Sequence, residues 1–157
     1  MVLTMLQKNY QRILWCYEMN SGKKILMIDD DTNLVNVFKI VLETKDYCFD
    51  SAYSASDGLK KIKEFMPDLI ILDVIMEDFV AGFRVVSELR AGKEDSEYKA
   101  FSKVPILMLT SVTSKTTISF SEKVGTALLP VDAFIEKPVK PVELIVKIEE
   151  LLQKQLN

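Results

Sequence analysis

Four short apolar runs in this chain each end at polar side chains. The runs and the residues that end them are residues 25–28 with Asp29, residues 69–72 with Asp73, residues 105–109 with Thr110, and residues 133–135 with Glu136 and Lys137. Unbroken apolar runs of this length are typical of strands buried on both faces of a parallel sheet. The carboxyl ends of parallel strands meet at one edge, where ligands usually bind. The pattern therefore predicts one crevice lined by these polar side chains.

Outside these runs, apolar residues recur at steps of three and four, which is typical of amphipathic helices. We predict strands at 24–28, 47–53, 69–73, 106–110 and 133–135, and helices at 33–45, 56–66, 82–90 and 142–156. The predicted inward faces are Leu34, Val37, Phe38, Val41 and Leu42; Leu59, Ile62, Lys63 and Met66; Phe83, Val86 and Leu89; and Leu144, Ile145, Ile148, Leu151 and Leu152. Asp31 or Thr32 is expected to cap the first helix, and Ser56 the second. Residues 93–103 are expected to form a polar loop, and 111–130 a loop with a short helix near 119–123.

The alternation of strands and helices predicts a single α/β domain. Five βα units with buried strands form a parallel sheet with helices on both faces. We expect the flavodoxin-like (βα)5 doubly wound arrangement, with strand order 2-1-3-4-5. No G-x-G-x-x-G follows the first strand, which argues against a dinucleotide site. A P-loop sequence is absent as well.

Residues 22–157 are expected to form this domain, and residues 1–21 an N-terminal extension. Lys8, Arg12 and Glu18 interrupt the extension, so it lacks the apolar run that would span a bilayer. No A-x-A-like signal-peptide cleavage site follows it. Its apolar residues recur at helical steps, which favours a short amphipathic helix. The alternative is a mis-assigned start, with the true chain beginning later in this segment.

Charge and rare residue types narrow the function. With a net charge of −3 and no basic stripe in 157 residues, the chain is not expected to bind nucleic acid. It contains no histidine, which excludes His-ligated zinc, Ser-His and Cys-His catalysis, and a phosphohistidine of its own. Cys16 and Cys48 lack a CxxC spacing and fit buried thiols in a reducing compartment. We therefore expect a cytoplasmic protein without a membrane partner.

The polar residues at the strand ends suit metal-assisted phosphoryl chemistry. Asp29, Asp30 and Asp73 are the oxygen ligands that Mg²⁺ prefers, and Mg²⁺ leaves positions open for phosphate oxygens. When several carboxylates lie close together, their mutual repulsion raises the pKa of at least one of them unless a cation neutralises the charge. A carboxylate beside a metal can attack phosphorus and form an acyl phosphate. Thr110 and Lys137 can then donate hydrogen bonds to the transferred group.

Four segments also carry a resemblance to a known family. ILMIDDD, PDLIILDVIM, VPILMLTS and AFIEKPVKP resemble, in this order, the motifs of response-regulator receiver domains, the phospho-acceptor half of two-component signalling. The resemblance covers about residues 23–154. It implies that Asp73 accepts a phosphoryl group from a histidine kinase or phosphotransfer protein, and that a downstream protein reads the result. The chain would then be a switch and not an enzyme.

The resemblance also implies a role for each residue of the site. The metal ligands for Mg²⁺ or Mn²⁺ would be Asp29, Asp30, Asp73 and the Ile75 carbonyl, the phosphoryl contacts Thr110 and Lys137, and the switch pair Thr110 and Phe134. A homodimer through the last helix and its neighbouring strand is an option that the family suggests. Pro138 directly after Lys137 suggests a fixed turn, with a cis peptide bond as one form.

Three loops depart from the family pattern. After Asp73 the chain reads VIMEDFVAGF, where the family usually has a proline after the methionine and an Asp-Gly one residue sooner. The stretches 93–103 and 111–130 are longer than usual. None of these departures removes a residue of the site, but the loops surround it and could select the partner kinase.

Three functions remain to be separated. The first is a stand-alone receiver that passes its state on by protein contact. The second is a degenerate receiver that serves only as a binding scaffold. The third is a haloacid-dehalogenase-type phosphatase, in which Asp29 would be the nucleophile and Asp31 the acid/base. The position of the phosphorylated aspartate distinguishes them, because it would be Asp73 in the first, none in the second and Asp29 in the third.

Ile75 and Val112 lie two residues beyond Asp73 and Thr110, at positions that in this family flank the path of attacking water. Both side chains are apolar, so neither can orient a water molecule for hydrolysis, and we predict slow loss of the phosphoryl group. The substitution Val112→Asn should shorten the half-life of phospho-Asp73 severalfold, measured by loss of label from the isolated phosphoprotein. An unchanged half-life would contradict this prediction.

Overall fold

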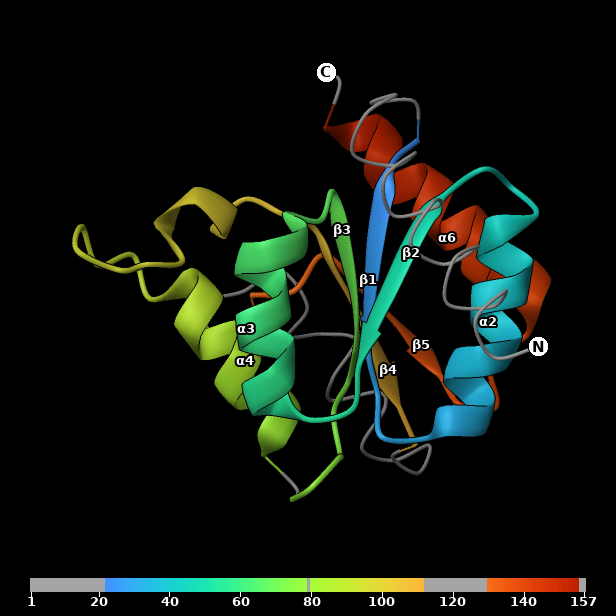
Figure 1. The fold of residues 1–157 in the computed structure, drawn as a ribbon, viewed down its shortest axis with the longest axis horizontal. Helices are drawn as coiled ribbons and strands as arrows, with labels where there is room; N and C mark the ends of the chain where they lie inside the picture. The colour runs from blue at the N-terminus through green and yellow to red at the C-terminus, as the bar shows by residue number, and fades with distance from the viewer. Residues whose placement is uncertain (1–21, 79, 112–129, 156–157) are drawn as a thin grey trace, which may run out of the picture.

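The computed structural model describes residues 22–78, 80–111 and 130–155. In these residues five strands form one sheet, and α-helices pack on both of its faces (Figure 1). In chain order the elements are β1 (Lys24–Ile28), α2 (Thr32–Glu43), β2 (Cys48–Ala52), α3 (Ala55–Phe65), β3 (Leu69–Asp73), α4 (Ala81–Arg90), the 3₁₀-helix η1 (Lys99–Phe101), β4 (Ile106–Thr110), β5 (Ala133–Glu136) and α6 (Pro141–Lys154).

The sheet confirms the predicted topology. Its strand order is β2-β1-β3-β4-β5, and every neighbouring pair is parallel. The bounds of β1, β3 and β4 are those predicted. β2 is one residue shorter at each end, and β5 extends by one residue to Glu136.

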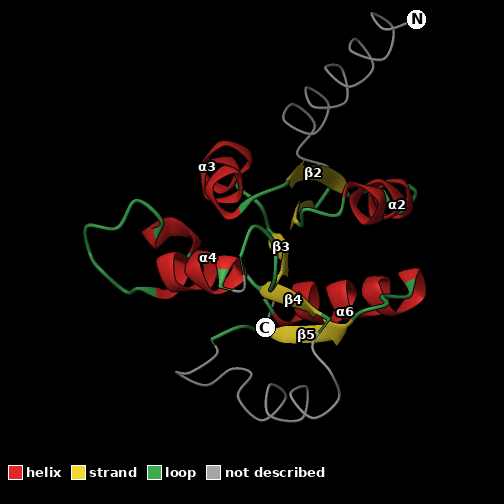
Figure 2. Ribbon diagram, turned by 90° about the horizontal axis from the view of Figure 1, so that it is seen from below, coloured by secondary structure: helices red, strands yellow, loops and turns green. Residues whose placement is uncertain are grey.

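Successive residues of each central strand face two separate cores. In β1, Leu26 and Ile28 belong to the core beneath α3 and α4, whereas Ile25 and Met27 belong to the core beneath α2 and α6. Figure 2 shows the two helix pairs on opposite sides of the sheet. Because both faces of these strands are covered, their sequences are continuously apolar and do not alternate.

The structure corrects the predicted inward face of α2 and confirms that of α6. On α2 the buried residues are Val35, Phe38 and Leu42, but Val37 is 49% exposed. Residue 37 lies about 100° around the helix from residue 38, outside the buried face. The last helix is confirmed, because all of its predicted inward residues are buried: Leu144, Ile145, Ile148, Leu151 and Leu152.

The second predicted helix needs correction at both ends. Its N-cap is Ser54, and not Ser56. Met66 adopts a left-handed conformation with φ 53° as the C-cap, so its side chain leaves the inward face and is 53% exposed. Lys63 points outward and forms an ion pair of 2.7 Å with Glu97. The buried face of α3 is instead Ala55, Gly58, Ile62 and Phe65.

Some predictions fall outside the described residues. These are the extension at residues 1–21, the short helix near 119–123, and the environment of Val112. The predicted polar loop at 93–103 is present and contains η1. In the described part of the chain, no helix has the length and apolar character needed to cross a membrane.

Cys48 differs from the prediction in its covalent state. Its side chain is fully buried at the start of β2, and its sulfur forms a disulfide bond. The prediction of a buried thiol is therefore wrong at this position. Disulfide formation requires two sulfurs to meet in space, which the spacing of cysteines along the chain does not reveal.

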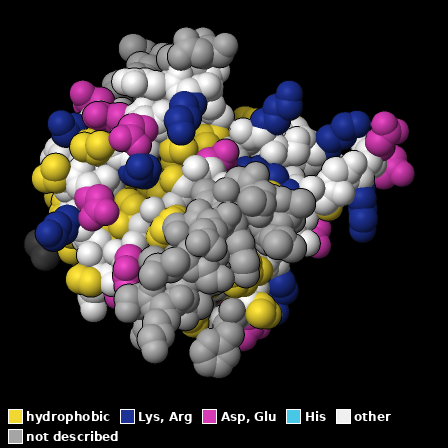
Figure 3. Space-filling view, turned by 180° about the vertical axis from the view of Figure 1, so that it is seen from behind, with side chains coloured by type: hydrophobic (Ala, Val, Ile, Leu, Met, Phe, Trp, Pro, Cys, Tyr) yellow, Lys and Arg dark blue, Asp and Glu magenta, His cyan; other side chains and the backbone are white. Residues whose placement is uncertain are grey.

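Charges of both signs are interspersed on the face drawn in Figure 3, with hydrophobic side chains between them. The described residues visible there form no continuous basic surface of the kind that nucleic-acid-binding proteins present. Among the exposed apolar side chains of the molecule are Val142 and Val146 on α6.

Arg90, at the end of α4, joins three segments at the amino edge of the sheet. Its guanidinium donates hydrogen bonds to the carbonyl oxygens of Ser102 at 2.6 Å, Val104 at 2.8 Å and Pro130 at 3.1 Å. It also contacts the Asp132 carboxylate at 3.1 Å. The side chain is only 16% exposed, and its hydrogen bonds to these carbonyls are partly buried. Arg90 therefore fixes the segments that lead into β4 and β5.

We predict that Arg90→Met lowers the free energy of unfolding by about 2–3 kcal/mol, because three partly buried carbonyl groups lose a charged hydrogen-bond donor. Denaturant unfolding followed by circular dichroism measures this. Arg84→Met is the matched control, since Arg84 is half exposed and forms surface ion pairs worth at most about 1 kcal/mol. Equal losses in the two variants would contradict the structural role of Arg90.

Candidate functional site

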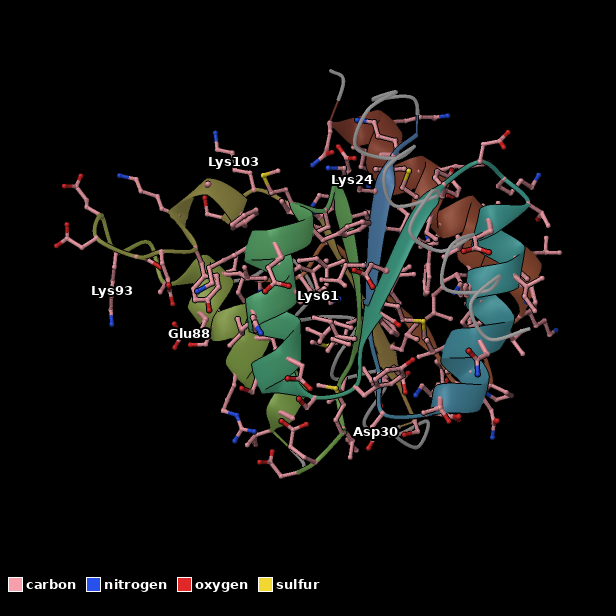
Figure 4. The ribbon with its side chains drawn as sticks, in the orientation of Figure 1. Lys24, Asp30, Lys61, Glu88, Lys93 and Lys103 are labelled. Atoms are coloured by element: carbon pink, nitrogen blue, oxygen red, sulfur yellow. The ribbon has the colours of Figure 1, made fainter. Side chains whose placement is uncertain are left out.

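Three carboxylates meet at the carboxyl edge of the sheet. Asp29 and Asp30 directly follow β1, and Asp73 is the last residue of β3, the strand that lies next to β1. One oxygen from each of the three lies within 4.8 Å of the others. Asp29 and Asp73 are buried, whereas Asp30 is exposed at the lower edge of Figure 4. The predicted acidic cluster is therefore present.

Asp29 is held at both of its carboxylate oxygens. Oδ1 accepts a hydrogen bond of 2.9 Å from the Asp31 amide, and Oδ2 lies 2.9 Å from Nζ of Lys137. Asp31 itself is the N-cap of α2, and its carboxylate accepts from the amides of Asn33 and Leu34. The prediction that Asp31 is a helix cap is confirmed, and its carboxylate is engaged with the helix.

Lys137 lies between the two buried carboxylates. Its Nζ is 2.9 Å from Asp29 and 3.2 Å from Oδ2 of Asp73. Its backbone amide donates a hydrogen bond of 2.7 Å to the Thr110 carbonyl, which anchors the segment after β5 to the end of β4. The Lys137–Pro138 peptide bond is cis, which is one of the forms that the sequence left open for this turn. The side chain therefore projects from its own strand end toward those of β1 and β3.

Burial and charge shift the pKa values of this cluster. Burial is the main cause that raises the pKa of Asp73 from 3.8 to about 6, while the Lys137 ammonium partly opposes the shift. For Lys137, burial by itself lowers the pKa, but the hydrogen bond and charge of Asp29 and the charge of Asp73 outweigh it, so the pKa is raised. Lys137 is therefore charged near neutrality, and Asp73 is the carboxyl group most affected by its surroundings.

The donor set fits a hard divalent cation. Three carboxylates face a single ammonium, which leaves an excess of negative charge. Oδ1 of Asp73 is buried, and no hydrogen-bond donor among the described residues reaches it. Buried polar atoms normally have a partner, and Mg²⁺ binds carboxylate oxygens of this kind. Ile75, whose carbonyl is the fourth predicted ligand, lies in the loop directly beyond β3.

Thr110 and Phe134 lie on neighbouring strands near this edge. Thr110 is the last residue of β4 and is buried. Phe134 is opposite Met108 in the β4–β5 register, two residues before Thr110 along β4. Both Met108 and Phe134 contribute to the core beneath α3 and α4, so Phe134 and Thr110 share a face of the sheet. Their predicted role as a switch pair remains a prediction.

Two residues near Asp73 received no site role from the sequence. A Cβ atom at Gly82 would collide with the Asp73 carbonyl oxygen and crowd Val74, so glycine is needed where α4 packs on the strand end. Glu77 contacts the start of α3 through the amide of Ala55. The sequence feature that could have drawn attention to Glu77 was the departure of this loop from the family pattern.

A family model described as "Response regulator receiver domain" matches residues 25–149. The DNA-binding response regulator MtrA of Mycolicibacterium smegmatis is 31% identical over 134 residues, which are 84% of this chain and 51% of MtrA. The alkaline phosphatase synthesis transcriptional regulatory protein PhoP of Bacillus subtilis is 31% identical over 133 residues, 85% of this chain and 50% of PhoP. The chain spans about half the length of the curated relatives it matches.

Solved structures show the same fold. A CheY-like response regulator receiver domain protein from Methanospirillum hungatei has a TM-score of 0.69 and 31% identity, with 86% of this chain and 97% of that one covered. The chemotaxis protein CheY4 of Vibrio cholerae has a TM-score of 0.66 and 25% identity, with 83% of this chain and 99% of that one covered.

We predict that Asp73→Asn stabilises the metal-free protein at pH 7.5 and has little effect at pH 4. The raised pKa of Asp73 means that the folded protein binds a proton more tightly than the unfolded chain. The stability that this proton contributes is complete below about pH 4 and is lost as pH rises through about 6, which costs on the order of 2 kcal/mol at neutral pH.

Denaturant unfolding of both proteins at several pH values, with EDTA present, measures this difference. Asp95→Asn is the control, since Asp95 lies exposed in the loop after α4. A stabilisation by Asp73→Asn that is independent of pH would contradict the explanation.

Proposed function

The chain belongs to the family of response regulator receiver domains of two-component systems, and from this we propose that it is a switch whose phospho-acceptor is Asp73. The donor we propose is a phosphohistidine of a histidine kinase or phosphotransfer protein, because this sequence contains no histidine. A downstream protein would recognise whether Asp73 is phosphorylated.

The geometry of Asp73 is the observation that carries the proposal. Its Oδ2 is held by Lys137, and its Oδ1 is buried where none of the residues described by the structure donates a hydrogen bond to it. In the reaction, one Asp73 oxygen forms a bond to phosphorus while the bond from phosphorus to the partner's histidine nitrogen breaks. The product is an acyl phosphate, and the imidazole leaves with the electron pair of the broken bond. A Mg²⁺ or Mn²⁺ ion bound by Asp29, Asp30, Asp73 and the Ile75 carbonyl would neutralise charge on the transferred group.

The other two residues complete the phosphoryl site. Lys137 already lies within contact of Asp73 and would pair with a phosphoryl oxygen once the carboxylate has become an acyl phosphate. The Thr110 hydroxyl, at the neighbouring strand end, would donate to a second oxygen. Pulling Thr110 toward the phosphoryl group would favour a new position of Phe134 on the same face of the sheet. This is the two-state element that a partner could read.

The two alternative functions are less well supported. A degenerate scaffold would have no need of a complete set of ligands, whereas Asp29, Asp30, Asp73 and Lys137 are all present and assembled. A phosphatase with Asp31 as acid/base would need that carboxylate at the site, but it caps α2. Signalling by a reversible acyl phosphate, and not turnover of a substrate, is therefore the activity we propose.

We predict that the protein takes up one phosphoryl group from a small phosphodonor when Mg²⁺ is present and none in excess EDTA. Intact-mass spectrometry measures the uptake, and reduction of the acyl phosphate followed by peptide mapping locates it at Asp73. Asp73→Asn should abolish uptake, and Lys137→Ala should slow it by on the order of 10²-fold. Asp95→Asn should behave as wild type. Phosphate on Asp29 would favour the phosphatase, and no uptake would favour the scaffold.

A further inference from the structure

We propose that Glu77 is a positioning residue for the metal site: it holds the loop that follows Asp73 against the start of α3. The inference rests on the proposed function and deepens it. Glu77 stands directly after Met76, where the family pattern stated above usually has proline. A proline stiffens a loop through its own ring. Glu77 can restrict the same loop only through the contacts of its side chain.

The main contact is a hydrogen bond to a helix end. The amide of Ala55 donates to both carboxylate oxygens of Glu77, at 3.1 and 3.3 Å. Ala55 is the first residue of α3, and the amides of a first helical turn have no partner within the helix. The side chain of the N-cap Ser54 accepts from the amide of Asp57 and not from that of Ala55. Glu77 therefore supplies, from another loop, an acceptor that α3 lacks, and its negative charge suits a helix N-terminus.

Arg84 adds a weaker second contact from α4. It lies 3.4 Å from Glu77 and 2.8 Å from Asp78. Arg84 is half exposed, and both acids are more than a third exposed, so these ion pairs contribute little energy. The partly buried hydrogen bond to Ala55 is the contact that decides the position of Glu77. The charge of Glu77 therefore matters less than the length of its side chain, which brings the carboxylate to the amide of Ala55.

The turn between β2 and α3, which Glu77 contacts, also binds the backbone of a predicted metal ligand. The carbonyl of Ala52, at the end of β2, accepts a hydrogen bond of 3.1 Å from the Asp29 amide. Ala52 ends β2 and Ala55 begins α3, so the two residues flank the same short turn. The turn from β2 to α3 thus holds the backbone of Asp29 and, through Glu77, the loop that carries the Ile75 carbonyl.

The far end of this loop is anchored separately. The Gly82 amide donates to the Val74 carbonyl at 3.1 Å, and the Asp78 carboxylate accepts from the Val80 amide at 2.9 Å. These bonds fix the loop to α4 but not to the strand that bears Asp29. Lys137 links the side chains of Asp29 and Asp73, and Glu77 links the loop that carries the Ile75 carbonyl to the turn that binds the Asp29 backbone. Partners that orient metal ligands typically change metal affinity by 10- to 100-fold.

Substitutions of Glu77 distinguish the effect of its side-chain length from the effect of its charge. Glu77→Gln keeps an oxygen acceptor at the same distance and removes the charge. Glu77→Asp keeps the charge but is one methylene too short to reach Ala55. Glu77→Ala removes both, and Glu94→Ala, in the exposed loop after α4, is the control. The measurement is the Kd for Mg²⁺ by isothermal titration calorimetry on the unphosphorylated protein, with the thermal unfolding midpoint recorded for each variant.

We expect Glu77→Asp and Glu77→Ala to weaken Mg²⁺ binding about tenfold, and Glu77→Gln and Glu94→Ala to stay within about threefold of wild type. In phosphoryl uptake, the Asp variant should need more Mg²⁺ but reach a near wild-type rate at saturation. The opposite pattern, with Gln weak and Asp normal, would show that only charge matters and would overturn the inference. Wild-type Kd values for every folded Glu77 variant would overturn it too.

The inference and the proposed function fail in different ways. A wild-type protein that binds Mg²⁺ but takes up no phosphoryl group would refute the function, and the Kd series would still judge Glu77. Normal uptake at Asp73 with Kd values insensitive to Glu77 would refute the inference alone. If Glu77→Ala does not fold, the comparison of Glu77→Asp with Glu77→Gln decides the question, since both variants retain a polar side chain at this position.

Discussion

The ammonium of Lys137 between two buried carboxylates is the interaction on which the site depends. Asp29 and Asp73 end neighbouring strands and are both buried, an arrangement that is costly for charged groups without partners. Lys137 contacts both, but one positive charge does not balance three carboxylates. Burial raises the pKa of Asp73 to about 6, with a smaller contribution from the charge of Asp29, and Oδ1 of Asp73 has no hydrogen-bond donor among the described residues. A divalent cation and a phosphoryl group together suit that imbalance.

The fold produces this arrangement through burial of the central strands. β1 and β3 are covered by helices on both faces, so a carboxylate at the end of either strand starts out partly enclosed. The parallel sheet brings those ends to one edge, and the bond from the Lys137 amide to the Thr110 carbonyl fixes where the chain leaves β5. At the opposite edge, Arg90 joins the segments that enter β4 and β5. β4 and β5 are therefore held in place by hydrogen bonds at both of their ends.

Loops beyond the strand ends need supports of their own. The turn from β2 to α3 provides one, since it accepts from the Asp29 amide and donates to Glu77. In this loop a side-chain contact stands where a proline ring would otherwise limit the backbone. The two solutions differ physically, because a ring stiffens the loop in isolation whereas Glu77 makes the loop's position depend on α3. The departure from the family pattern thus changes how the loop is held without changing the residues of the site.

The sequence by itself determined the strands, their order and the residues of the acidic cluster, because doubly buried strands read as apolar runs and parallel strands end at one edge. It also identified Asp31 as a cap, since a short acidic side chain before a helix has a local role. Only the tertiary structure decided the outward position of Val37, the contact of Glu77 with Ala55, and the disulfide of Cys48. Each of these depends on which distant segment lies opposite a side chain, and local periodicity carries no information about that.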